Sequence, residues 1–284
     1  MGGLKILFFS FLSLALLFSF FLFFFYEKDS GTDCFDGILS GTCLDLKPFF
    51  CNESKVVYAP EKCGCLENFV FKEGKCLSDF QTGPRKISFD YFLDGEKKVL
   101  EYEVYSGVAD YLSKLNREIK LLEGNYSREI FERTIIEEEI QKNFVLPLAI
   151  EIYNLGKNRK ERIEIARTLV QLIPYEESKK ITDFYGMKIP YTRYPYEVLY
   201  ENKGICGDKS QLLYLILDYL GEDVVLFYFP KENHEGVGIK CRSGSFKKTG
   251  YCYIETTGLF KIGTNPSGAS GIYGSFEEFE KIKV

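Results

Sequence analysis

The chain has 284 residues, of which 45% are hydrophobic and 27% charged, and this composition is typical of a folded protein with a substantial core. Its net charge of −5 excludes nucleic acid as an expected partner, because phosphate backbones are bound by clustered lysine and arginine and no basic stripe is present.

An uncharged apolar run extends from Ile6 to Tyr26. Its length matches the roughly 20 residues that a helix needs to cross a bilayer. A secretory signal usually has a shorter apolar region and a small-residue cleavage site, whereas this run ends in Tyr-Glu-Lys-Asp. The sequence therefore predicts an uncleaved transmembrane anchor at 6–26, with a cleaved signal as the alternative. Residues 1–5 are expected in the cytoplasm, and the rest of this single-pass cell-membrane protein on the extracytoplasmic side.

Nine cysteines follow the anchor, and most of them lie in a short segment at 31–79. This density is typical of a disulfide-rich module in an oxidising compartment. Zinc binding is the alternative, but the segment has neither a CxxC pair nor a histidine. The spacing does not choose among the disulfide connectivities. The three later cysteines, if two of them pair, leave one free thiol; they are Cys206, Cys241 and Cys252.

A β-hairpin is predicted at 80–106, because alternating apolar residues flank Asp94-Gly95. Residues 107–284 are expected to hold a helical region and the functional core. Apolar residues with helical spacing predict helices at about 108–122, 127–153 and 160–173. The acidic run at 137–139 is interpreted as a solvated helix face.

A Tyr- and Pro-rich loop is predicted from Tyr185, and a helix is predicted to begin near Cys206. That helix is apolar on nearly every face, which indicates a central, buried position. Three strands are predicted after it, at 223–229, 234–241 and 250–257. The expected fold class is therefore α+β, with a central helix packed on an antiparallel sheet.

Cys206 is predicted at the start of the buried helix, where unpaired backbone N–H groups and the helix dipole favour an anion. This position favours the nucleophilic thiolate, and the same N–H groups suit an oxyanion. His234, the single histidine of the chain, is the candidate to activate the thiol. Asp208 is expected to cap the first helical turn rather than to act in catalysis.

Glu255 is the candidate to orient the imidazole of His234. Direct pairing of Cys241 with Cys252, or of His234 with Glu255, places both cysteines on one face of the hairpin and His234 and Glu255 on the other. The two pairings belong to registers four positions apart, so a bulge or a longer loop is expected between them.

The segment GICGDKSQLLYLIL, the later histidine and the segment YIETT resemble the transglutaminase-like, papain-related superfamily of cysteine enzymes. The resemblance covers about 169–260 and includes LVQLIPY and RYPYEVL. It implies a papain/transglutaminase-like core in which Cys206 is the nucleophile, His234 the base and then the acid, and Glu255 the orienting group. The family more often has aspartate in the last position. It also often uses a tryptophan at the oxyanion site, which this chain lacks, and Tyr194 is one candidate in its place.

The predicted function is that of a membrane-anchored extracytoplasmic cysteine enzyme. It would act on peptide or glutamine-type amide bonds through a thioester, as a protease or amidase or as a transglutaminase. The expected partners are a protein or peptide substrate and the membrane, and no cofactor or metal is expected. The alternative is a non-catalytic binding module for cell-surface polymers or partner proteins.

Overall fold

The computed structural model describes residues 33–35, 37–115, 128–184, 187–268 and 274–284. The predicted cytoplasmic segment 1–5 and the predicted anchor 6–26 lie outside these ranges. Among the helices within them, none combines the length and apolar character needed to cross a bilayer. The described residues form a mixed helix and sheet fold with a disulfide-rich region near the N-terminus.

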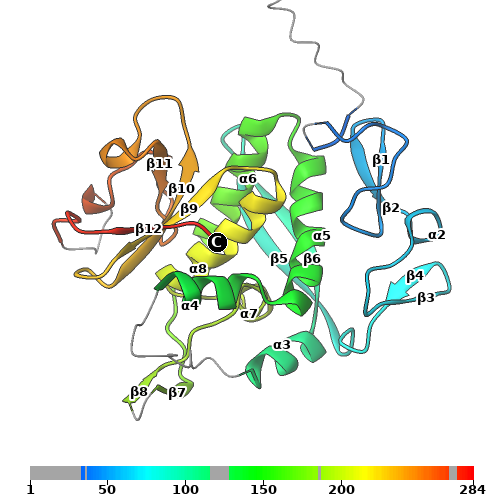
Figure 1. Ribbon diagram of the computed structural model, residues 1–284, viewed down its shortest axis with the longest axis horizontal. Helices are drawn as coiled ribbons and strands as arrows, with labels where there is room; N and C mark the ends of the chain where they lie inside the picture. Colours follow the sequence, from blue (N-terminus) through cyan, green and yellow to red (C-terminus); the bar gives the residue numbers. More distant parts are fainter. Residues whose placement is uncertain (1–32, 36, 116–127, 185–186, 269–273) are drawn as a thin grey trace, which may run out of the picture.

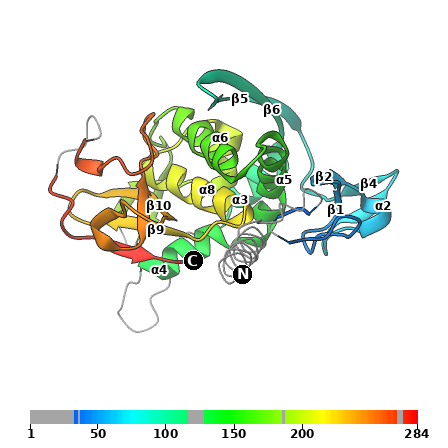
Figure 2. The same ribbon diagram turned by 90° about the horizontal axis from the view of Figure 1, so that it is seen from above.

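The central element is helix α8 (Cys206–Tyr219), as the all-round apolar pattern predicts. The residues 208–217 of this helix are buried without exception. Figures 1 and 2 show α8 between the main sheet on one side and helices α5 (Glu139–Leu155) and α6 (Arg159–Leu172) on the other. Because every face of α8 is covered, its N-terminal residues have a fixed position relative to the sheet.

The main sheet is antiparallel, with strand order β11-β10-β9-β12. The three predicted strands are confirmed as β9 (Val224–Phe229), β10 (His234–Lys240) and β11 (Tyr251–Ile254). The edge strand β12 (Glu280–Ile282), which was not predicted, pairs with β9 and is too short to show a pattern in the sequence. The sheet is buried on both faces, by the core around α8 and by an aromatic cluster of Phe227, Phe229, Phe246, Tyr253 and Phe276.

The helical region differs from the prediction in two places. The predicted helix at 127–153 is two helices, α4 (Arg128–Ile136) and α5, because the carboxylate of Glu138 accepts hydrogen bonds from the backbone N–H groups of Ile140 and Gln141. An N-cap of this kind starts a new helix, so the interpretation of 137–139 as a solvated helix face is wrong for Glu138. The first helix, α3 (Ser106–Ser113), ends before Lys114, and the part of its predicted range at 116–122 lies outside the described residues.

The segment after α6 also contains more regular structure than predicted. Strand β8 (Met187–Pro190) lies within the loop expected from Tyr185, and it pairs with β7 (Ile181–Phe184), which comes just before that loop. Pro190 lies at the end of that ladder, where a missing N–H donor is tolerated. Helix α7 (Pro195–Glu201) then leads into the segment before α8.

The predicted hairpin is confirmed as β5 (Pro84–Leu93) and β6 (Glu96–Tyr105), which turn at Asp94 and Gly95. Both turn residues have positive φ, which an Asp-Gly pair adopts readily. The hairpin lies over α6 (Figure 2), and the backbone N–H of Phe92 donates to the Thr168 hydroxyl.

The cysteine-rich module contains short elements only, and it lies beside α5 in Figure 1. Its disulfides join Cys34 to Cys51, Cys43 to Cys63 and Cys65 to Cys76, so no thiolate of the module remains for zinc. The elements of the module are β1 (Phe49–Asn52), β2 (Lys55–Tyr58), α2 (Pro60–Cys63), β3 (Val70–Lys72) and β4 (Lys75–Leu77).

A fourth disulfide joins Cys241 to Cys252 across the β10–β11 connection. We expect the variant Cys241→Ser/Cys252→Ser to lose about 2–3 kcal/mol of unfolding free energy, because a closed loop of this length restricts the unfolded chain. Urea denaturation followed by circular dichroism measures this loss. An unchanged midpoint would contradict the constraint assigned to this bridge.

Candidate active site

Cys206 is the first residue of α8, and its thiol is free and partly exposed. The carboxylate of Asp208 accepts a hydrogen bond from the backbone N–H of Ile205 and forms an ion pair with Arg193, at 3.2 Å in each case. Asp208 therefore caps the helix as predicted, and it ties the first turn to the segment before α7. The remaining eight cysteines form the four disulfides, so Cys206 is the one thiol available for chemistry.

His234 begins β10, and Glu255 directly follows β11. The Nε2 atom of His234 lies 2.9 Å from Oε2 of Glu255, and both side chains are almost fully buried. The Cys206 thiol lies within hydrogen-bonding reach of the same imidazole. Since Nε2 faces Glu255, Nδ1 is the nitrogen left for the thiol. The structure thus brings the three predicted side chains together.

A single regular register accounts for both cross-strand pairs of this hairpin. The ladder pairs Val237 with Ile254 and Ile239 with Cys252. In this register Cys252 lies two positions along the strand from the residue directly opposite Cys241. Glu255 likewise lies two positions from the place directly opposite His234. Each pair is therefore a diagonal contact, and the expected bulge or longer loop is wrong. The prediction that the cysteines and the His–Glu pair occupy opposite faces is confirmed.

Tyr253 completes the arrangement around His234. Its hydroxyl lies 3.1 Å from Nε2 of His234 and donates to Oε2 of Glu255 at 3.0 Å. The Tyr253 ring passes so close to Gly236 that a Cβ there would lie within 2.5 Å of the ring carbons, so glycine is required. Tyr253 is two residues before Glu255 and on the same face of the strand, so strand alternation was the signal that could have identified it.

The second carboxylate oxygen of Glu255 is held by neighbouring threonines. Oε1 accepts hydrogen bonds from the backbone N–H groups of Thr256 and Thr257 at 2.9 Å and from the Thr257 hydroxyl at 2.7 Å. All three partners are donors, so this oxygen is held as an acceptor. These threonines belong to the segment YIETT, whose resemblance to the superfamily implies a role for Glu255 but none for the threonines.

The electrostatics of the pair favour the ionised form of both groups. Burial by itself lowers the pKa of His234, but hydrogen bonds with Cys206 and Glu255 and the charges of both outweigh it and raise this pKa to about 10. Burial by itself raises the pKa of Glu255, but His234 and the donors of Thr257 outweigh it and lower this pKa to about 2. At neutral pH the site therefore holds an imidazolium against a carboxylate.

Hydroxyl groups connect the first turn of α8 to the strands. The Ser210 hydroxyl donates to the carbonyl of Glu235 at 3.1 Å and lies 3.1 Å from the Thr256 hydroxyl, which in turn donates to the Cys206 carbonyl at 3.4 Å. These contacts link the backbone that carries the thiol to the two strands that carry His234 and Glu255.

Two buried residues of α6 and α8 support the site from behind. Gln171 donates to the backbone carbonyl of Glu255 at 2.6 Å, and Lys209 donates to the carbonyls of Gln171 and Ile173. Burial lowers the pKa of Lys209 to about 8, despite the opposing charges of Glu255 and Cys206. These roles could not be predicted from the sequence, because both residues lie within otherwise apolar helical patterns.

A buried ionic cluster lies on the other side of β10. Arg128 contacts Glu132 at 2.6 Å and Glu235 at 2.8 Å, and Gln211 donates to Glu132 at 2.8 Å. Burial and the charge of Glu132 raise the pKa of Glu235 well above its usual range. The cluster connects α4 and α8 to the residue that follows His234.

Metal binding has no visible basis in the described part of the chain, where no group of three or more His, Cys, Asp or Glu side chains is placed to hold an ion.

Tyr194, the candidate oxyanion donor, is buried as the N-cap of α7, and its backbone N–H donates to Glu197. Tyr175 is 59% exposed and lies near Cys206, whose charge adds to partial burial in raising the pKa of the phenol.

Comparisons with known proteins give little further guidance. No family model matches the sequence, and no curated protein matches it. A solved structure from Parabacteroides distasonis, described as a "putative protease", is similar at 15% identity with a TM-score of 0.32. The match covers 65% of this chain and 42% of that one. A likeness this weak establishes neither a shared fold nor a shared activity.

Proposed function

We propose that this protein is a cysteine enzyme with a papain/transglutaminase-like core that acts on peptide or glutamine-type amide bonds through a thioester. The observation that carries the proposal is the free Cys206 thiol within hydrogen-bonding reach of a buried imidazole that Glu255 holds at 2.9 Å. A thiol, an imidazole and an orienting carboxylate are the groups that activate a sulfur nucleophile. A protein that only binds a ligand has no need of all three.

In the first half of the reaction, the Cys206 thiolate attacks the amide carbonyl carbon and the carbonyl oxygen becomes an oxyanion. The backbone N–H groups at the start of α8 stabilise this charge. The C–N bond then breaks, and the protonated His234 gives its proton to the leaving amine. The product is a thioester on Cys206 and a neutral imidazole, which Glu255 and Tyr253 keep in position.

In the second half, water or a second amine attacks the thioester. His234 takes a proton from the attacking group, and the Cys206 thiolate leaves as the new C–O or C–N bond forms. Water makes the protein a protease or an amidase, whereas a lysine amine makes it a transglutaminase. Both outcomes use the same residues, so the products decide between them.

The setting proposed for this activity is the extracytoplasmic side of the cell membrane. The apolar run at 6–26 is proposed as the single-pass anchor, and four disulfides suit an oxidising compartment. A protein or peptide substrate is the proposed partner, and the chemistry described needs no cofactor.

The test is to treat the protein with an electrophilic amide probe and to map the label by peptide mass spectrometry, beside incubation with a mixed peptide pool. We expect the label on Cys206, and shortened, deamidated or cross-linked peptides identify the activity. An unlabelled Cys206 together with an unchanged pool would leave a binding module as the function.

A further inference from the structure

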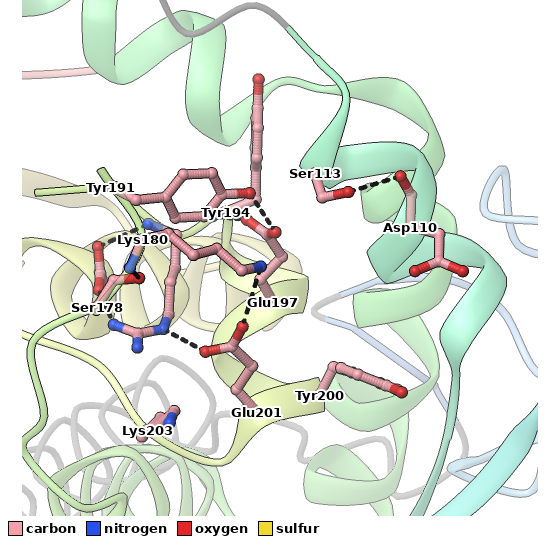
Figure 3. Close-up of polar contacts among 12 residues, drawn as sticks. Asp110, Ser113, Ser178, Lys180, Tyr191, Tyr194, Glu197, Tyr200, Glu201 and Lys203 are labelled. Atoms are coloured by element: carbon pink, nitrogen blue, oxygen red, sulfur yellow. Dashed lines mark hydrogen bonds and ion pairs between the residues drawn. The ribbon is translucent and has the colours of Figure 1, made fainter. Parts of the chain in front are cut away.

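A basic pocket lies beside the segment that leads into Cys206. It is a cavity of about 350 Å³ between the start of β5, the segment 176–180 and the end of α7. Figure 3 shows Lys180 extended toward Glu201 within it, with Ser178 beside Lys180 and Lys203 below. The cations that line the pocket are Arg85, Lys179, Lys180, Arg193 and Lys203.

The two carboxylates of the basic pocket are already paired. Glu176 contacts Lys203 at 2.9 Å. Glu201 contacts Arg193 at 2.8 Å and Lys180 at 3.6 Å. These pairs leave an excess of positive charge, although the whole chain carries a net charge of −5.

Arg85 and Lys179 are the cations of the basic pocket that have no carboxylate within ion-pair distance among the described residues. Both side chains are exposed. Arg85 donates to the carbonyl of Tyr200, and its guanidinium lies 4.6 Å from the centroid of the Tyr200 ring. The ring contact holds this cation at the wall of the pocket, where it remains open to an anion.

The basic pocket is close to the nucleophile along the chain. Lys203 precedes Cys206 by three residues, so their Cα atoms are at most about 11 Å apart. The backbone N–H of Glu176 donates to the carbonyl of Gly204 at 3.3 Å, which fixes the segment after Tyr175 beside the approach to Cys206. Glu176 and Lys203, which line the pocket, therefore lie on the two segments that meet just before Cys206, and an extended peptide covers about 11 Å with about three residues.

We propose that the basic pocket binds a carboxylate of the substrate, within about three residues of the bond that Cys206 attacks. This inference rests on the proposed function and adds the substrate class, which is an acidic peptide. The carboxylate belongs either to an aspartate or glutamate side chain or to the C-terminus of the peptide. The recognition chemistry is the same in both cases, because each presents two oxygens to lysine and arginine donors.

The test compares peptides that differ only by glutamate or glutamine at each position near the scissile bond, and by a free or amidated C-terminus. We expect the charged peptide to have about tenfold higher kcat/KM at one position, with the ratio falling as salt is raised. The position of the effect tells a side-chain carboxylate from a terminal one. A ratio near one at every position and at the C-terminus would overturn the proposal.

Two double variants locate the effect. Arg85→Gln/Lys179→Gln is expected to reduce the glutamate-to-glutamine ratio to below about threefold. Lys72→Gln/Lys86→Gln, which removes the same charge from exposed lysines outside the pocket, is expected to leave the ratio unchanged. Equal loss in both variants would assign the preference to the overall charge of the chain and contradict the pocket.

A binding measurement separates this inference from the proposed function. Fluorescence anisotropy with the Cys206→Ser variant compares the affinities of the two labelled peptides without turnover. We expect about tenfold tighter binding of the charged peptide, which holds even if no peptide is converted. Turnover of both peptides with equal affinities would contradict the carboxylate site and leave the cysteine chemistry intact.

Discussion

Cys206→Ser is expected to lower the kcat/KM of amide turnover by at least about a thousandfold. Serine keeps the shape of the side chain at the start of α8 but does not supply a thiolate. The oxyanion position and the substrate contacts remain, so weak residual activity is expected rather than none. The midpoint of urea unfolding should stay close to that of the wild type, because the thiol makes no bridge.

The matched control for this variant is Cys241→Ser/Cys252→Ser, which removes two sulfurs from the opposite face of the hairpin. It is expected to keep label on Cys206 and to retain most of the activity under conditions where it is folded. A second readout uses the fact that His234 is the single histidine. In a chain produced without a histidine tag, its NMR titration should move below the wild-type pKa of about 10 in Cys206→Ser, because the thiol contributes to that value. Unchanged turnover in Cys206→Ser would remove the cysteine from the reaction.

The side chains of the candidate site could be predicted from the sequence because each depends on a local rule. The position of Cys206 at the start of a helix predicts its role as nucleophile. The alternation of side chains along a strand predicts that His234 and Glu255 share one face of the sheet. The register between β10 and β11 could not be predicted, because side-chain alternation determines which face a residue occupies but not which residues of the two strands lie opposite each other. Diagonal contacts within one register satisfy both pairs, whereas direct pairing would require two registers four positions apart.

Three features of the fold could not be predicted from the sequence, each for its own physical reason. Glu138 starts a helix through contacts with its own backbone neighbours, and an apolar pattern that continues on both sides conceals this break. Strand β12 is defined by its partner β9 rather than by its own residues. The disulfide connectivity depends on which loops of the cysteine-rich module meet in space, and cysteine spacing does not encode that directly.

Gln171 and Lys209 show why supporting residues are harder to predict than reacting ones. Both lie in helices whose apolar pattern predicts burial, and buried polar groups must find partners. The partners are carbonyls of Gln171, Ile173 and Glu255, which come from two separate parts of the chain. Such contacts exist only after α6 and β11 have packed on α8.

Glu255→Gln is expected to reduce kcat/KM by about 10²- to 10⁴-fold, although it changes one oxygen to nitrogen. The three donors from Thr256 and Thr257 hold an acceptor at the Oε1 position, so the glutamine carbonyl takes that place. The amide NH₂ then faces Nε2 of His234, which must accept a hydrogen bond. The proton of the neutral ring therefore sits on Nδ1. Because Nδ1 is the nitrogen that faces Cys206, the ring can no longer accept the proton of the thiol.

The same variant should change the pH dependence in a defined direction. In the wild type, the pKa of His234 is raised from 6.5 to about 10, so the imidazolium is lost, and the proposed activity is expected to fall, as the pH rises through about 10. Stability linked to this pairing is complete below pH 6.5 and is lost over the same rise. The Glu255 pKa is lowered from 4.5 to about 2, so its contribution is present above pH 4.5 and is lost as the pH falls through about 2. Without the carboxylate charge, the alkaline limb of the variant should move below pH 10.

The measurement is the pH profile of kcat/KM together with the NMR titration of His234 in the wild type and in Glu255→Gln. Glu53→Gln, which removes one exposed carboxylate in the cysteine-rich module, serves as the control and should keep the wild-type profile. If Glu255 orients the imidazole, the alkaline limb of the kcat/KM profile and the pKa of His234 from NMR shift together in Glu255→Gln. If kcat/KM falls while the His234 titration stays near 10, Glu255 acts on the fold rather than on the imidazole, because its charge would then contribute nothing to the proton affinity of the ring.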